Sequence, residues 1–112
     1  MVKPHRITAG TDYRNTVRRG RRVGGKITIA HAVFVSEEHP ARFGYIISKA
    51  VGNAVVRNRI RRRMKAISDD IVREGFTGAD VVFRALPAAQ TASFHDLKHE
   101  MHHQVARIWH GK

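Results

Sequence analysis

The sequence contains no cysteine, and this absence excludes three kinds of chemistry. Disulfide bonds, thiolate metal sites and a cysteine nucleophile are all ruled out. Stability must therefore come from the hydrophobic core alone. With 112 residues, 42% of them hydrophobic, and no internal repeat or linker, the sequence predicts one domain over residues 1–112.

Long apolar runs are also missing. No stretch approaches the roughly 18 residues that a membrane-spanning helix needs, and the N-terminal residues lack the apolar core of a signal peptide. We therefore expect a soluble, cytoplasmic protein that does not bind membranes. No obligate protein partner is expected either.

Acidic residues are scarce. The chain has 9 Asp and Glu against 21 Lys and Arg, which gives a formal net charge of +12. A charge of this size in a small domain indicates an anionic partner, and nucleic acid is the most common one. The alternative, an anionic membrane surface, is disfavoured because no broad apolar face is available for lipid.

The positive charge is concentrated between residues 57 and 65, where six of nine residues are basic. Apolar residues recur through the same segment at helical spacing: Val56, Ile60, Met64, Ile67 and Ile71. This pattern predicts an amphipathic helix with one buried side and a basic remainder. Because like charges three and four positions apart repel one another, an external polyanion is the natural partner. A merely solvated basic face is the alternative.

The remaining patterns predict an α+β fold. A short helix should follow residue 10 and end at Gly20, and strands are expected over residues 26–35 and 42–48, joined as a hairpin. The basic helix should run over residues 53–74, followed by a strand over 80–86 and a helix over 93–109. This order describes a two-layer sandwich with helices on one side of a mixed sheet. Residues 1–10 read as a mobile basic arm.

One local string resembles the bacterial ribonuclease P protein family. The matching residues, in order, are Phe43, Gly44, Ser48, Lys49, Val51, Gly52, Asn53, Ala54, Val55, Val56, Arg57, Asn58 and Arg59. The similarity extends over nearly the whole chain, from a first helix bearing Tyr13 to the closing helix. It implies the fold of the second domain of a small-subunit ribosomal protein, in which the basic helix lies in an unusual left-handed βαβ crossover.

The resemblance also implies a function. Members of this family are small cofactors of a catalytic RNA that removes the 5′ leader from precursor tRNA. The RNA carries out the hydrolysis and holds most of the required Mg²⁺, while the protein helps to bind the leader. On this basis the chain has no catalytic residues of its own.

The family pattern assigns roles to particular residues of this chain. The surface for the catalytic RNA is expected to comprise Arg57, Asn58, Arg59, Arg61, Arg62, Arg63 and Lys65. Lys49 and Asn53 should lie where phosphates or hydrated metal ions are held. Tyr13, Val17 and His31 should line the leader groove, which would be less aromatic than in many relatives because Val17 and His31 replace aromatic residues.

Two other functions are compatible with the composition. A structural RNA-binding protein of the ribosomal kind would have the same size and charge. A self-sufficient nuclease is disfavoured, since the sequence shows no Ser/His/Asp, Cys/His or paired-carboxylate pattern. On the last helix His95, His99 and His103 share one face, but without an associated acidic residue we interpret them as solvated surface rather than as a zinc site.

Overall fold

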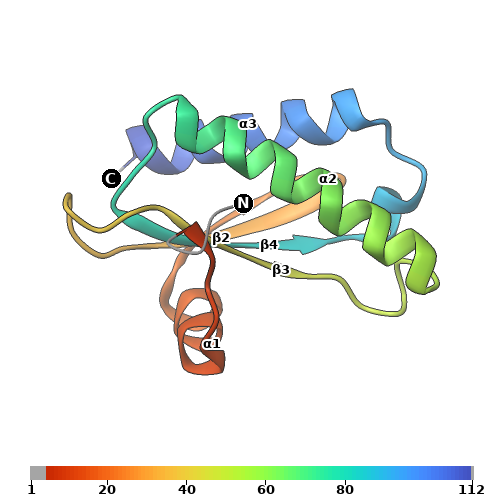
Figure 1. The fold of residues 1–112 in the computed structure, drawn as a ribbon, viewed down its shortest axis with the longest axis horizontal. Helices are drawn as coiled ribbons and strands as arrows, with labels where there is room; N and C mark the ends of the chain where they lie inside the picture. The colour runs from red at the N-terminus through yellow and green to blue at the C-terminus, as the bar shows by residue number, and fades with distance from the viewer. Residues whose placement is uncertain (1–4, 112) are drawn as a thin grey trace.

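The computed structural model describes residues 5–111. Its elements, in chain order, are α1 (Gly10–Arg19), β1 (Arg21–Gly24), β2 (Thr28–Phe34), β3 (Arg42–Ile46), α2 (Ala54–Arg73), β4 (Ala79–Ala85), the short 3-10 helix η2 (Pro87–Gln90) and α3 (Phe94–His110) (Figure 1). The three α-helices and the strands β2, β3 and β4 were predicted from the sequence. β1 and η2 were not.

The strands form one mixed sheet in the order β1-β2-β4-β3. β2 pairs antiparallel with both β1 and β4, whereas β3 pairs parallel with β4. The predicted hairpin between β2 and β3 is therefore wrong, because β4 lies between them. β4 is the strand with a continuous buried run, Val81, Val82 and Phe83, and such a strand takes a central position with neighbours on both edges.

β3, α2 and β4 form a βαβ unit with an unusual hand. Both strands run toward the right of Figure 1, and α2 returns above the sheet. α2 packs on β3 and passes in front of α3, which packs on β1 and β2, so β3 is the strand nearest the viewer. The crossover is therefore left-handed, as the family resemblance implied, whereas nearly all such connections are right-handed.

The helices cover both faces of the sheet. α2 and α3 lie above it and build the main core, and the predicted apolar stripe of α2 is buried at Ile60, Met64, Ile67 and Ile71 (Figure 1). α1 lies below the sheet against β2 and β4. The expectation that all helices share one side is thus wrong. Only Gly20 separates α1 from β1, and α1 lies on the face of the sheet opposite to α2 and α3.

α3 is bound to the β1–β2 turn by two polar side chains, the buried Gln104 and the half-buried Glu100. Gln104, which is 1% exposed, donates hydrogen bonds to the carbonyl oxygens of Val23 and Thr28 at 3.3 and 2.9 Å. The Glu100 carboxylate accepts from the backbone N–H groups of residues 26–28 at 2.7–3.3 Å. Phe94, the first residue of the helix, is 40% exposed.

The segment preceding α1 packs along the free edge of β3. Arg6 forms a parallel bridge with Phe43, and the Ile7 N–H donates to the Phe43 carbonyl at 3.0 Å. Ile7 is 2% exposed. The prediction of a mobile arm over residues 1–10 is therefore wrong for residues 5–10, because a buried isoleucine anchors them. Residues 1–4 lie outside the described part of the chain.

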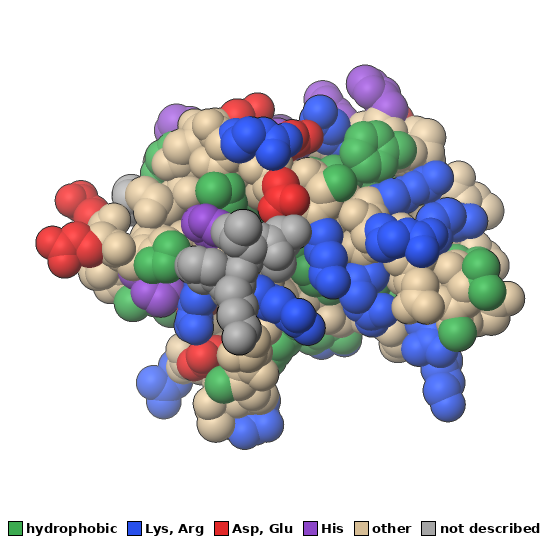
Figure 2. Space-filling model, in the orientation of Figure 1, with side chains coloured by type: hydrophobic (Ala, Val, Ile, Leu, Met, Phe, Trp, Pro, Cys, Tyr) green, Lys and Arg blue, Asp and Glu red, His purple; other side chains and the backbone are tan. Residues whose placement is uncertain are grey.

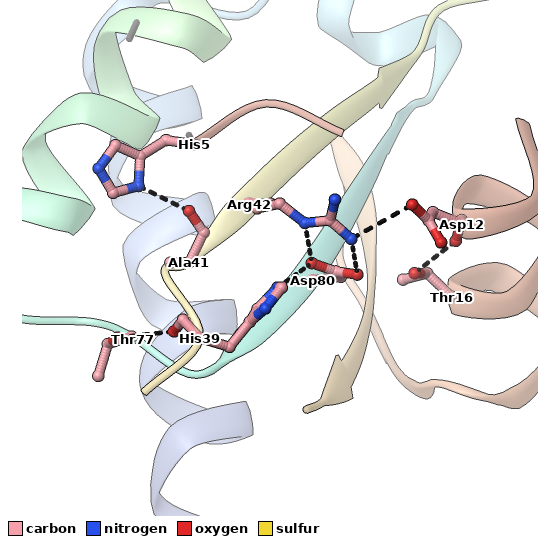
Figure 3. A network of polar contacts seen from close by, with 8 residues as sticks. All are labelled: His5, Asp12, Thr16, His39, Ala41, Arg42, Thr77 and Asp80. Atoms are coloured by element: carbon pink, nitrogen blue, oxygen red, sulfur yellow. Dashed lines mark hydrogen bonds and ion pairs between the residues drawn. The ribbon is translucent and has the colours of Figure 1, made fainter. Parts of the chain in front are cut away.

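A polar network attaches α1 to the sheet (Figure 3). Arg42 on β3 donates two hydrogen bonds to Asp80 on β4, from Nε to Oδ1 at 2.8 Å and from Nη2 to Oδ2 at 2.7 Å. The same Nη2 reaches the Asp12 carboxylate of α1 at 3.3 Å, and the ring of His39 contacts Asp80 at 3.0 Å. Burial alone would raise the pKa of Asp80, but the hydrogen bonds from Arg42 and His39 outweigh it and lower the pKa.

The Asp80 network predicts acid-sensitive stability. Because the folded-state pKa of Asp80 lies below its unfolded value of about 3.9, the carboxylate stabilises the fold above that pH, and the contribution is lost as pH falls through the folded pKa. Asp80→Asn weakens charge-assisted hydrogen bonds and should lower the free energy of unfolding at neutral pH by about 2 kcal/mol. Urea titrations between pH 2 and 7 should show a shallower acid dependence for this variant than for wild type. An unchanged pH profile would contradict the assignment.

The burial of the apolar stripe of α2 predicts which substitutions in this helix destabilise the fold. Ile60→Asp would bury a carboxylate at a position that is 1% exposed, and should cost more than about 4 kcal/mol, enough to unfold the domain. Val55→Asp in the same helix is the control, because Val55 is 76% exposed. Circular dichroism melting curves should show loss of the transition only for the first variant. Identical melting curves for the two variants would mean that the apolar stripe of α2 is not part of the hydrophobic core.

Candidate nucleic-acid interface

The loop between β3 and α2 presents a positive charge at the start of the basic helix. Val51, which is 1% exposed, anchors the loop in the core, and its N–H donates to the Ser48 carbonyl at 3.1 Å. Lys49 is exposed at the turn. Asn53 is the N-cap of α2, and its side-chain oxygen accepts from the Val56 N–H at 3.0 Å. The two residues therefore flank the positively polarised N-terminus of α2.

The predicted RNA-facing residues of α2 are not equally exposed. Asn58 and Arg62 are exposed, while the other five, Arg57, Arg59, Arg61, Arg63 and Lys65, are half-buried. Half-burial means that part of each side chain packs along the helix and the neighbouring loop while the rest reaches solvent. The basic run is thus an ordered surface rather than a set of freely moving side chains.

Two arginines of this run also hold the structure together. The Arg59 guanidinium donates to the Gln90 carbonyl at 2.7 Å, and the Arg63 guanidinium donates to the Ala92 carbonyl at 3.3 Å. These bonds fasten the η2–α3 connection to α2. Each guanidinium has five N–H donors, so most remain available to a ligand. Sequence patterns alone did not reveal this second role, because the carbonyl partners lie about thirty positions away.

Other cations of the run lack protein partners. Among the described residues, Arg57, Arg62 and Lys65 form no hydrogen bond or ion pair through their side chains, and the Nε of Arg57 is buried without an acceptor. Arg61 donates only to the neutral Asn58 side chain, at 3.1 Å. Figure 2 shows Lys and Arg side chains gathered on the right-hand half of the molecule, where α2 begins. Anionic ligands would complete the coordination of these groups.

The opposite end of the molecule carries acids. Glu37 and Glu38 are both exposed in the loop between β2 and β3, which Figure 1 places at the left, far from the first turn of α2. Figure 2 shows acidic side chains projecting from the same end. The charge distribution is therefore polarised along the long axis of the molecule.

A groove of about 210 Å³ lies between α1 and the lower face of the sheet. Tyr13 and Val17, two of the residues expected in a leader groove, line it, and the full lining consists of Tyr13, Arg14, Val17, Arg18, Ile46 and Arg84. The ring of Tyr13 lies so close to Gly44 that a Cβ there would fall 2.5 Å from the ring carbons. Glycine at position 44 therefore lets α1 approach β3, and the Tyr13 hydroxyl accepts from the Tyr45 N–H at 3.3 Å.

His31 does not reach this groove. It is 6% exposed on β2, in register with Arg22 and Val82, and is not among the groove-lining residues. Burial, with smaller effects of the positive charges of Arg84 and Arg22, lowers the pKa of His31 and so disfavours its charged form. His31, expected from the family resemblance in the leader groove, therefore lies outside the groove lining.

Ile46 and Arg84 are groove residues that the sequence analysis missed. Arg84 lies on β4, a strand that is otherwise apolar or buried along its length. An arginine inside such a strand was the available signal, because a buried strand carries a charge only where one face opens to solvent or ligand.

The acids of α2 form ion pairs on the helix surface. Asp70 pairs with Arg73 of the same helix and also with Lys98 of α3, at 3.2 Å. Glu74 contacts His102 at 3.1 Å. Within residues 5–111 no three His, Asp or Glu side chains are arranged to hold a metal ion, and no helix there could span a membrane.

Comparisons with known proteins agree with this architecture. The family model described as Ribonuclease P matches residues 1–109. The ribonuclease P protein component of Clavibacter michiganensis is 41% identical over 107 residues, covering 96% of this chain and 95% of that protein. The corresponding protein of Rhodococcus opacus is 43% identical over 115 residues, covering 96% and 91%.

Solved structures share the fold at lower identity. The RNase P protein from Thermotoga maritima superposes with a TM-score of 0.82 at 16% identity, covering 92% of this chain and 96% of that one. The RNase P protein of Staphylococcus aureus gives 0.77 at 20% identity, covering 95% and 98%. The resemblance noted in the sequence is thus confirmed by the family model, by curated relatives and by fold: this chain belongs to the ribonuclease P protein family.

Proposed function

We propose that this chain is the protein cofactor of ribonuclease P. In this role it binds the catalytic RNA and the 5′ leader of precursor tRNA, and it promotes Mg²⁺-dependent removal of the leader. The observation that carries the proposal is the cluster of cationic side chains on α2 without protein partners, in a member of this family. Hydrolysis itself is assigned to the RNA subunit.

The catalytic RNA would bind along α2. Phosphates would pair with Arg57, Arg62 and Lys65, whose charges nothing in the described protein compensates. Arg59 and Arg63 would use their remaining donors, so they would couple RNA binding to the position of the η2–α3 connection. Because backbone contacts carry no base information, this surface would read the shape of the folded RNA rather than its sequence.

Mg²⁺ would be held by RNA phosphates rather than by the protein. Mg²⁺ requires several oxygen ligands in octahedral geometry, usually including a carboxylate. The loop before α2 offers no carboxylate, and the amide oxygen of Asn53 already caps the helix. The residues therefore do not fit a protein-held magnesium site. Lys49, at the positive end of α2, suits a phosphate instead.

The leader would lie in the groove beneath the sheet. Tyr13 offers part of an aromatic ring and Ile46 an apolar surface against which bases can pack. Arg14, Arg18 and Arg84 surround them and would pair with leader phosphates. Because His31 is buried outside the groove lining, its titration would make no direct contribution to leader binding.

The α2 surface predicts a specific salt dependence. If about six side chains each neutralise one phosphate, log affinity for the catalytic RNA should fall with log salt at a slope of about −4 to −5. Arg57→Ala combined with Arg62→Ala should make this slope shallower by about 1.5 and leave the melting temperature nearly unchanged. Filter-binding assays across a salt series would measure the slope for wild type and for the double variant. A wild-type slope near −1 would contradict the proposal that α2 binds the catalytic RNA through many phosphate contacts.

The control removes equal charge elsewhere. Arg73→Ala combined with Arg107→Ala deletes two exposed arginines from the ends of α2 and α3, outside the basic run. This pair should retain the wild-type slope to within about half a unit. If both double variants lost affinity equally, binding would follow net charge rather than the α2 surface.

A cleavage assay tests the cofactor role. Precursor tRNA should be cut at low Mg²⁺ only when the chain and the cognate catalytic RNA are mixed, and slowly or not at all with either alone. Gel analysis of the released leader would measure the rate. Cutting by the chain alone would make it a nuclease. Tight RNA binding without any change in cleavage would indicate a structural RNA-binding protein of the ribosomal kind.

A further inference from the structure

The outer face of α1, turned away from the leader groove, carries a second group of arginines. They surround a surface hollow of about 390 Å³ whose lining comes entirely from this helix: Thr11, Arg14, Asn15, Arg18 and Arg19. Arg14, Arg18 and Arg19 are all exposed. No residue expected from the sequence to bind RNA lies on this face.

These arginines are uncompensated. Within the described chain, none of the three guanidiniums has a hydrogen-bond or ion-pair partner. The only acid of α1 is Asp12, and its carboxylate is already engaged by Arg42. Arg14 and Arg18 stand four positions apart, where like charges destabilise a helix. α1 also begins at Ala9 without a side-chain cap. An anion bound at this face would relieve the repulsion.

The hollow is continuous with the groove. Arg14 and Arg18 line both of them, whereas Asn15 and Arg19 line only the outer hollow. The two shared arginines therefore form the ridge between them. A single strand whose bases occupy the groove could keep its phosphates on Arg14 and Arg18 as it passes over α1. The next phosphates would then meet Arg19.

We propose that the outer face of α1 is a phosphate-binding surface for the part of the leader that extends beyond the groove. This inference rests on the proposed function. The catalytic RNA backbone is the other possible source of phosphate. The leader is favoured because the arginines adjoin the groove, while α2 lies on the opposite face of the sheet (Figure 1).

The test combines leader length with a single substitution. Arg19→Gln removes one charge from the outer hollow without touching the groove. Arg107→Gln is the matched control, because Arg107 is also an exposed arginine in the last turn of a helix. The affinity of each holoenzyme for precursor tRNA would be measured with leaders lengthened one nucleotide at a time.

Arg19→Gln should bind short-leader substrates like wild type and lose about fivefold in affinity once the leader exceeds a threshold length. Its salt slope should fall by about 0.7 for long leaders only. Tyr13→Ala, a groove variant, should lose affinity at shorter lengths as well. Arg107→Gln should match wild type throughout.

Three outcomes would overturn the inference. Equal losses for Arg19→Gln and Arg107→Gln would show a general charge effect. A loss that is independent of leader length, with weaker binding to the catalytic RNA alone, would assign the surface to that RNA. No loss at any length, while Tyr13→Ala still weakens binding, would leave the groove as the whole leader site. If wild type itself ignored leader length, the proposed leader function would fail first.

Discussion

The structure depends on one constraint: α2 must bury a narrow apolar stripe while almost everything else on its first half is cationic. Ile60, Met64, Ile67 and Ile71 are each at most 2% exposed, and burial of such side chains contributes about 1.5–3 kcal/mol apiece. Repulsion between like charges on neighbouring turns costs about 0.2–0.5 kcal/mol per pair. Burial therefore wins by a wide margin, and the helix can hold arginines at a density that a free peptide would not tolerate.

The sheet separates this helix from the groove. Alternation along β4 sends Val81 and Phe83 to the core beneath α2 and α3, and sends Asp80, Val82 and Arg84 toward α1. The two faces have different chemistry, since the upper one is apolar and the lower one contains an ion-pair network and a groove. A ligand on α2 and a ligand under the sheet could thus be bound at once, each with its own set of cations.

The local structure and the basic helix could be predicted from the sequence, because both follow from the periodicity of its apolar residues. The stripe of α2, the start of this helix near Asn53 and the strand β4 were all visible in the spacing of a few residues. The pairing of strands that are distant in sequence could not be read in this way. A hairpin between β2 and β3 was expected, whereas β4 lies between them. β1 was missed because a four-residue strand with only Val23 buried has no periodic signal.

The candidate site shows the same contrast between local features, which the sequence predicts, and long-range arrangements, which it does not. Tyr13 and Val17, which the family resemblance assigned to a leader groove, line the groove between α1 and the sheet. His31, assigned with them, does not line it, because the alternation of β2 identifies its face but not how deeply α1 covers it. The ridge of Arg14 and Arg18 became visible only once α1 was known to lie alone on the lower face, fixed there by Arg42 between Asp12 and Asp80.

The separation of charge along the molecule has a kinetic consequence. With Glu37 and Glu38 at one end and the start of α2 at the other, the protein is a permanent electric dipole as well as a cation. In the field of a large RNA such a molecule experiences a torque before any contact is made. Diffusional encounters would then arrive with the basic end already leading, so fewer collisions are lost to wrong orientations. Added salt would weaken this alignment at distances beyond about 8–10 Å, in addition to lowering the affinity of the docked complex.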